Sequence, residues 1–325
     1  MVRYFSNVAA ATFVILGAAF ASHAAWADSP FNCDRVCLKN ITDLYFKAMA
    51  AHDRSMLSLA PELKYTETGH ALKLGEGIWR TASGLPTYRL ELFDPETGGI
   101  GVHAVVPDGK LCTIMSLRLK VMDHRITEVE TLLIAQDTKI VGAAPDRLTK
   151  PSNYWTRTIR PAEQNSRYEL IAAADAYFRA MESNGTLDYI RAPWLPDTNR
   201  YENGLQVTNV VMSKDFPAKT VAESFDVGRY KGGSARDRRY PVVDSETGAV
   251  MSLVRFGDPM GPLRAPGLPP GSAPPDPSLR VGASFVSEIF AVTQGKIVEI
   301  QAFWIPADGQ IPTPWPVGTV PVRDH

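Results

Sequence analysis

The sequence predicts an α+β protein in which one design is used twice, and three observations support this prediction. A helix-like phrase occurs as YFKAM at residues 45–49 and again as YFRAM at 177–181. A turn phrase follows each copy at a similar distance, TETGH at 66–70 and YENGL at 201–205. The rest of each copy consists of strand-like segments joined by turns too short for parallel crossovers. A chain of 325 residues has room for two such domains.

Positive and negative side chains almost cancel. The chain carries 34 Lys and Arg residues against 35 Asp and Glu residues. This balance gives no strong electric field toward nucleic acid or an anionic membrane. We therefore expect no nucleic-acid partner, and no membrane partner for the mature protein.

The first 27 residues have the pattern of a secretory signal. Arg3 is followed by an apolar run at 8–20 and by Ala25-Trp26-Ala27, a small-x-small site. A retained membrane anchor is the alternative, but the run is shorter than the ~20 apolar residues of a spanning helix. We expect cleavage after Ala27 and an exported protein, periplasmic or secreted.

Three cysteines follow the leader, and export permits disulfides between them. Cys33 and Cys37 lie four residues apart, about one helical turn, which favours a bond between them and leaves Cys112 as a buried free thiol. The spacing excludes a Cys-x-x-Cys redox pair. No histidine-rich cluster accompanies the thiols, so no metal site is expected.

The first domain is expected at residues 28–135. Residues 36–51 have the apolar spacing of an amphipathic helix, and 53–59 predicts a second short helix that ends at Pro61. A hairpin with Gly69 in its turn is predicted at 65–74. Antiparallel strands follow, at 88–93, 100–106, 111–122 and 125–134.

Proline-containing residues 136–165 predict a linker, and the second domain is expected at 166–305. It repeats the elements of the first domain, with a helix at 168–181, an Asn203-Gly204 hairpin and strands at 250–256, 284–292 and 296–305. Residues 257–280 form an insertion rich in proline and glycine, either an ordered lid or a floppy loop. The tail, 306–325, is expected to lie extended over the surface.

Three phrases carry a family resemblance: YFKAMAAHD at 45–53, LGEGIW at 74–79 and RITEVE at 125–130. They resemble the NTF2-like superfamily, most closely its SnoaL-like and DUF8021-type members, as two tandem copies of which the first is clear and the second degenerate. The resemblance implies a cone, a curved antiparallel sheet wrapped round the helix with a pocket at one end. It also implies that the two cones pack as an internal pseudo-dimer. It implies no single activity, because this cone houses isomerases, cyclases, dehydratases, lyases and binding modules.

Four ionisable residues of the first copy are candidates for catalysis. Glu67 and His70 could share acid–base work, provided that Gly69 bends the chain and brings them together. His103 lies on the central strand, where it would be a base if its face is concave, and Arg118 could bind a carboxylate or enolate oxygen. Three of them have a structural alternative: a hairpin turn for Glu67, a hydrogen-bonded core or surface position for His103, and a solvated sheet face with cross-strand partners Glu128 and Glu130 for Arg118.

Aromatic side chains would line or fill the first cone. Tyr45, Trp79 and Tyr88 are the candidates for a ligand pocket, although each is also a plausible core residue. The sequence contains no phosphate-binding glycine loop, no dinucleotide fingerprint, no nucleophile elbow and no His-Glu-x-x-His motif. A mechanism without a cofactor is therefore expected.

These observations lead to two hypotheses of function. The first is a cofactor-independent lyase, isomerase or dehydratase that acts by acid–base chemistry on a small, partly apolar or aromatic molecule in the first cone. The second is a non-enzymatic binding or assembly module of the cell envelope. An open cone with convergent ionisable groups would favour the enzyme, and a closed cone with an outward-facing His103 would favour the module.

Overall fold

The computed structural model describes residues 31–138, 142–182, 193–214, 217–226, 235–257, 283–307 and 314–316. The expected leader at 1–27 lies outside these residues, as do the insertion except for Gly257 and most of the tail. Within the described part of the chain, no helix is long and apolar enough to cross a membrane.

The first unit is a long helix followed by a six-stranded sheet. Its helices and strands are α1 (Arg35–Ala50), η1 (Arg54–Met56), β1 (Leu59–Glu67), β2 (His70–Ala71), α2 (Ile78–Thr81), β3 (Tyr88–Asp94), β4 (Gly99–Asp108), β5 (Leu111–Met122) and β6 (Arg125–Ala135). The strands lie in the order β2-β1-β6-β5-β4-β3.

The second unit repeats this topology after a linker of short turns. The linker contains η2 (Pro145–Arg147), α3 (Asn153–Thr156) and η3 (Pro161–Glu163). The unit itself comprises α4 (Arg167–Glu182), β7 (Trp194–Glu202), β8 (Leu205–Gln206), α5 (Val221–Asp226), β9 (Ala235–Asp244), β10 (Ala249–Phe256), β11 (Ala283–Thr293) and β12 (Lys296–Ala307). Its strand order, β8-β7-β12-β11-β10-β9, matches that of the first unit, and the predicted α+β class is confirmed.

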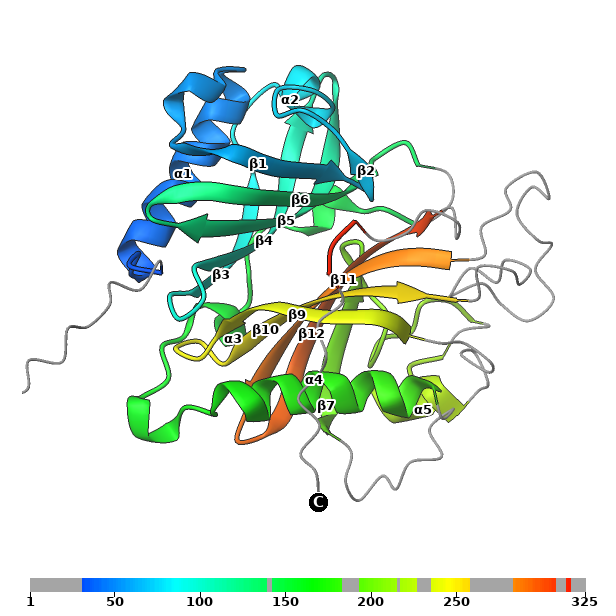
Figure 1. Ribbon diagram of the computed structural model, residues 1–325. Coiled ribbons are helices and arrows are strands. Elements are labelled where there is room, and N and C mark those ends of the chain that lie inside the picture. The colour runs from blue at the N-terminus through cyan, green and yellow to red at the C-terminus, as the bar shows by residue number, and fades with distance from the viewer. Residues whose placement is uncertain are drawn as a thin grey trace, which may run out of the picture.

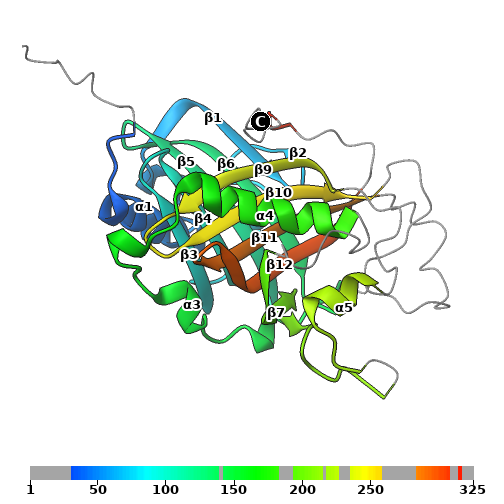
Figure 2. The ribbon, with the colours of Figure 1, turned by 90° about the horizontal axis from the view of Figure 1, so that it is seen from below.

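The two sheets face each other between the two long helices, α1 on one side and α4 on the other (Figures 1 and 2). Three apolar cores hold these layers together. One lies between α1 and the first sheet, and a second between α4 and the second sheet. The third joins residues of both sheets, among them Leu90, Leu132, Met251 and Phe303. Each sheet therefore has an inner face toward its own helix and an outer face toward the other unit.

The second helix predicted for the first domain, at residues 53–59, does not form. Residues 54–56 form only a 3-10 turn, and Pro61 lies inside β1 instead of ending a helix. The proline is tolerated because β1 pairs irregularly with β6 between Leu59 and Lys64, so no ladder hydrogen bond is required there. β1 also runs parallel to β6, which the sequence did not indicate. Five elements separate the two strands and leave ample chain for the return.

Two equivalent ion pairs connect the two units. Arg35, the first residue of α1, contacts Asp244 at the end of β9, with 2.8 Å between Nη1 and Oδ1. Arg167, the first residue of α4, contacts Asp94 at the end of β3, with 2.7 Å between Nη1 and Oδ2. Each aspartate also accepts a backbone N–H from the other unit, from Phe93 at Asp244 and from Val243 at Asp94. The contact is reciprocal, as in a symmetric dimer interface.

Candidate functional site

The first cone is filled by its own aromatic side chains. Tyr45 and Trp79 are fully buried, stand edge to face at 5.3 Å between ring centroids, and share a hydrogen bond from Trp79 Nε1 to the Tyr45 hydroxyl of 3.1 Å. Glu67 lies beside them, where its carboxylate accepts the Tyr65 hydroxyl and the backbone N–H of Ile78 at 2.9 Å. Glu67 thus fixes the start of α2 against β1.

Burial raises the pKa of the Glu67 carboxyl, although these two hydrogen bonds lower it. His70 is the cross-strand partner of Glu67, because Thr68 and Gly69 form the turn with positive φ values of 47° and 84°. The expected bend at Gly69 therefore exists. The His70 side chain, however, lies on the exposed surface, while Glu67 is occupied within the cone.

His103 lies on the outer face of the first sheet, toward the second unit. Its ring stacks on Phe303 at 3.9 Å between centroids and is fully buried. Nδ1 lies 3.2 Å from Oε1 of Gln301, so it carries the proton, and Nε2 accepts from the Ser287 hydroxyl at 2.9 Å. Burial lowers the pKa of His103 to about 3. A neutral imidazole that lies between two sheets, with both nitrogens hydrogen-bonded, is a core residue. The face of the first sheet that carries His103 therefore does not line a pocket of the first cone.

Arg118 shares that outer face and is held by its neighbours. Its guanidinium contacts Glu128 at 2.7 Å and Glu130 at 2.9 Å, and lies over the ring of Trp315 at 4.5 Å. These are the cross-strand partners of the structural alternative. Tyr88 also faces the other unit, with its hydroxyl on Gln301. The structure therefore spreads the predicted site over three places and brings together only Glu67 with Tyr45 and Trp79.

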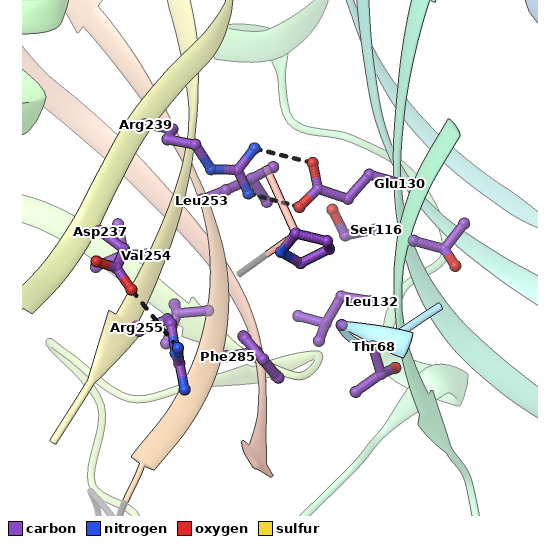
Figure 3. Close-up of a pocket in the computed structure, with 14 residues that line it drawn as sticks. Thr68, Ser116, Glu130, Leu132, Asp237, Arg239, Leu253, Val254, Arg255 and Phe285 are labelled. Atoms are coloured by element: carbon purple, nitrogen blue, oxygen red, sulfur yellow. Dashed lines mark hydrogen bonds and ion pairs between the residues drawn. The ribbon is translucent and has the colours of Figure 1, made fainter. Parts of the chain in front are cut away.

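A hollow lies between the two sheets, with about 490 Å³ of empty space including its open mouth (Figure 3). Its charged side chains are paired, one pair between the units and one within the second sheet. Arg239 forms two hydrogen bonds to Glu130, and Arg255 lies 3.6 Å from Asp237. Pro314 of the tail lines the same space. The inter-sheet hollow is thus a neutral seam between the units.

A second hollow opens inside the cone of the second unit, with about 350 Å³ of empty space including its mouth. It lies between α4 and the inner face of the second sheet, and its lining combines apolar walls with a buried charged cluster. The residues that line it are Tyr177, Met181, Arg200, Glu202, Phe256, Val286, Glu288, Ala302 and Trp304.

The strand register explains how this cluster forms. Glu288 on β11, Ala302 on β12 and Glu202 on β7 are successive register partners, so they form one row across the inner face. Because alanine is small, the space between the two carboxylates stays open. Arg200 lies on β7 two residues before Glu202 and contacts its Oε1 at 2.9 Å. Arg200 Nη1 also donates to the Tyr177 hydroxyl at 3.1 Å.

Glu288 is the strongly perturbed group in this hollow. Its side chain is buried, 2% exposed, and hydrogen-bonds the Tyr177 hydroxyl. Burial raises the pKa of Glu288 to about 8, with the positive charge of Arg200 opposing the shift and the negative charge of Glu202 adding to it. A carboxyl group that exchanges its proton near neutral pH in a hollow is suited to general acid–base chemistry.

The sequence analysis missed this cluster because it assigned the chemistry to the first copy. The register places Tyr65 at the position of Arg200, Leu117 at that of Glu288 and Thr131 at that of Ala302. Only the equivalence of Glu67 and Glu202 was visible as a repeated phrase. A signal was present, since a glutamate within the apolar run of β11 is unusual for a core strand.

Metal-ligand geometry occurs once among the residues that the structure describes. The sulfurs of Cys33 and Cys37 and a ring nitrogen of His124 all lie within 4.8 Å of one another. The two sulfurs are joined, which confirms the predicted disulfide. Cys112 is a free thiol and is half-buried, not buried as expected.

A family match falls on the second unit. Residues 163–304 match a family described as a domain of unknown function, DUF8021. The copy that the sequence analysis took as degenerate is therefore the one that the family matches. No protein of curated function matches the chain.

Solved structures of similar shape each cover less than half of this chain. A candidate polyketide cyclase from a Silicibacter species is 11% identical, with 42% of this chain and 89% of that chain covered and a TM-score of 0.30. One from Xanthomonas campestris is 13% identical, with 42% and 90% covered and a TM-score of 0.28. A candidate SnoaL-like polyketide cyclase from a Jannaschia species is 13% identical, with 46% and 90% covered and a TM-score of 0.28.

Proposed function

We propose that the protein is an enzyme that moves a proton on a small, partly apolar carbonyl compound in the cone of the second unit. The observation that carries this proposal is the position of Glu288, a buried carboxyl group with a pKa near 8 that lines an open hollow. The reaction class remains the one expected from the sequence, a lyase, isomerase or dehydratase without a cofactor. The proposed site, however, lies in the second cone and not in the first cone, where the sequence predicted it.

Each group in the hollow has a role in such a reaction. The ionised Glu288 carboxylate would take a proton from the carbon next to the carbonyl group, and the protonated form would return it at another atom. The electron pair left behind would move onto the carbonyl oxygen. Arg200, which is 1% exposed, supplies a positive charge in a water-poor environment where that oxyanion would develop. Glu202 holds the guanidinium in place through its Oε1.

The walls of the hollow set the kind of substrate. Phe256, Val286 and Trp304 present apolar and aromatic surface. The indole Nε1 of Trp304 donates to Glu202 at 3.3 Å, so the ring is fixed in one orientation. A flat, partly aromatic molecule with one carbonyl group would contact these walls and place its oxygen near Arg200.

The test uses 2-tetralone, a small aromatic ketone with acidic C–H bonds, in deuterated buffer. Proton NMR would follow exchange of the hydrogens next to the carbonyl group, which reports proton abstraction whatever the natural reaction is. We expect exchange faster than in buffer, with a rate that rises through an apparent pKa near 8. In Glu288→Gln the protein-dependent rate should fall by about 10²- to 10⁴-fold.

The matched variant is Glu67→Gln, because Glu67 occupies the equivalent position to Glu202 in the first cone. Loss of exchange in Glu67→Gln but not in Glu288→Gln would return the chemistry to the first cone and refute the proposal. Binding of 2-tetralone, seen as saturation transfer from the protein, without any exchange would favour the alternative of a non-enzymatic binding module.

The module alternative has one supporting observation, the closed state of the first unit. Its cone is filled by Trp79 and Tyr45, and His103 belongs to the contact between the units. We assign this unit a structural role within an internal pseudo-dimer, an arrangement supported by the reciprocal pairs Arg35–Asp244 and Arg167–Asp94. We also propose export, on the basis of the leader pattern together with the disulfide.

A further inference from the structure

The disulfide at the start of α1 has an unequal environment at its two sulfurs. Cys33 is buried, 2% exposed, and belongs to the core of the first unit. Cys37 is half-buried at the surface, in the first turn of the helix, where Asp34 caps it by accepting the Cys37 backbone N–H at 2.8 Å. A reagent in solvent therefore reaches the sulfur of Cys37 and not that of Cys33.

A histidine from a distant turn lies against the accessible sulfur. His124, in the turn between β5 and β6, places Nδ1 3.3 Å from Cys37 Sγ. The residue is exposed, and its backbone has a φ of 58°, as in a tight turn. A protonated imidazole at this distance stabilises a thiolate, and so does the N-terminus of a 16-residue helix. The carboxylate of Asp34 acts in the opposite direction, but it is engaged by the Cys37 backbone N–H.

We propose that Cys33 and Cys37 form a redox-active pair that exchanges with small thiols, with Cys37 as the reacting sulfur, Cys33 as the resolving sulfur and His124 as the residue that stabilises the Cys37 thiolate. The Cys-x-x-Cys spacing is absent, but the features that make a thiol reactive do not depend on it: access, a nearby cation, a helix N-terminus and an adjacent buried partner thiol.

The exchange takes two steps that balance. A thiolate of the small thiol attacks Cys37 Sγ; the bond between the two cysteines breaks, a mixed disulfide forms on Cys37, and the electron pair leaves on Cys33 Sγ, which takes up a proton. A second thiolate then attacks the outer sulfur of the mixed disulfide and releases Cys37 as a thiolate beside His124. The small thiol is oxidised to its disulfide and the protein is reduced to the dithiol.

The test uses the protein in the Cys112→Ser background, which removes the third thiol. Samples are equilibrated with reduced and oxidised glutathione at several ratios, trapped with iodoacetamide and analysed by mass spectrometry of the peptides. We expect the disulfide to open within the range of these buffers, with Cys37 alkylated before Cys33. Because His124 stabilises the reduced form, His124→Ala should shift the equilibrium toward the disulfide by about three- to tenfold.

Arg125→Ala is the control, since Arg125 is the exposed neighbour of His124 in the same turn and lies outside the cluster. Its equilibrium should match that of the parent protein. A disulfide that glutathione leaves intact at every ratio would be a structural cross-link and would overturn the proposal. Equal equilibria in His124→Ala and Arg125→Ala would overturn the role of His124. Neither outcome bears on Glu288, which lies in the other unit.

Discussion

The buried carboxyl group of Glu288 should make the stability of the protein fall as the pH rises. In an unfolded chain this glutamate titrates near 4.5, whereas burial raises its pKa to about 8 in the folded protein. Between these values the folded state holds a proton that the unfolded chain has released, so folding weakens with increasing pH. At about 1.4 kcal/mol per pH unit once the unfolded chain is ionised, the loss between pH 5 and pH 8 comes to about 3–4 kcal/mol. Below pH 4.5 both states are protonated and the contribution is constant.

Urea denaturation at pH 5, 6, 7 and 8 measures this dependence for the parent protein and for Glu288→Gln. Glutamine keeps the size and the neutral charge of the protonated side chain. The free energy of unfolding of the variant should therefore fall less with pH than that of the parent, and the difference between the two should grow at each step. Glu62→Gln, an exposed change on β1, corrects for a general effect of removing one carboxylate. If the parent and Glu288→Gln give parallel curves, Glu288 is ionised in the folded protein and the proposed acid–base role fails with it.

Three further predictions concern the contact between the units. Burial lowers the pKa of His103 to about 3, so the parent should lose stability as the pH falls below 6.5, and His103→Gln should reduce that loss in the same urea assay. Asp94→Asn and Asp244→Asn should each lower the free energy of unfolding by about 2–3 kcal/mol, between the values for surface and buried ion pairs, and by similar amounts because the two sites are equivalent. If the changes in the free energy of unfolding for the two variants differ by more than about 1 kcal/mol, the two sites are not equivalent. Trp315, which is buried against Thr66, should contribute about 1–3 kcal/mol, so Trp315→Ala should lower the midpoint of thermal unfolding while Pro316→Ala, at an exposed neighbour, should not.

The architecture could be predicted from the sequence because it is repeated in local patterns. The YF-x-AM phrase predicts the helix of each unit. Gly69 and Gly204 predict the two hairpin turns, because these turns need a residue with a positive φ. The disulfide followed from spacing alone. By contrast, Pro61 was taken as a helix stop, although an irregular edge of a sheet accepts proline as well.

The candidate site could not be predicted in the same way, because it depends on which face of each strand points inward. The sequence predicts His103 on the central strand of the first sheet, but not that its side chain lies on the face away from α1. That face meets a second sheet, a contact between residues about 200 positions apart along the chain, which no local pattern reports. For the same reason, the approach of Glu288 to Arg200 appears only once β11, β12 and β7 are placed side by side.

The first cone carries the clearer sequence motif, whereas the site that we propose lies in the second cone. Sequence motifs that are easy to recognise often fill a core or form a turn, and LGEGIW does both. It places Trp79 in the first cone, and the backbone N–H of Ile78 at the start of α2 donates to Glu67. In the second unit Phe225 of α5 packs on Tyr177 as Trp79 packs on Tyr45, but the row that contains Ala302 between two glutamates lines a hollow. Buried carboxylates without a nearby cation would destabilise the fold, and Arg200 in place of Tyr65 supplies that cation.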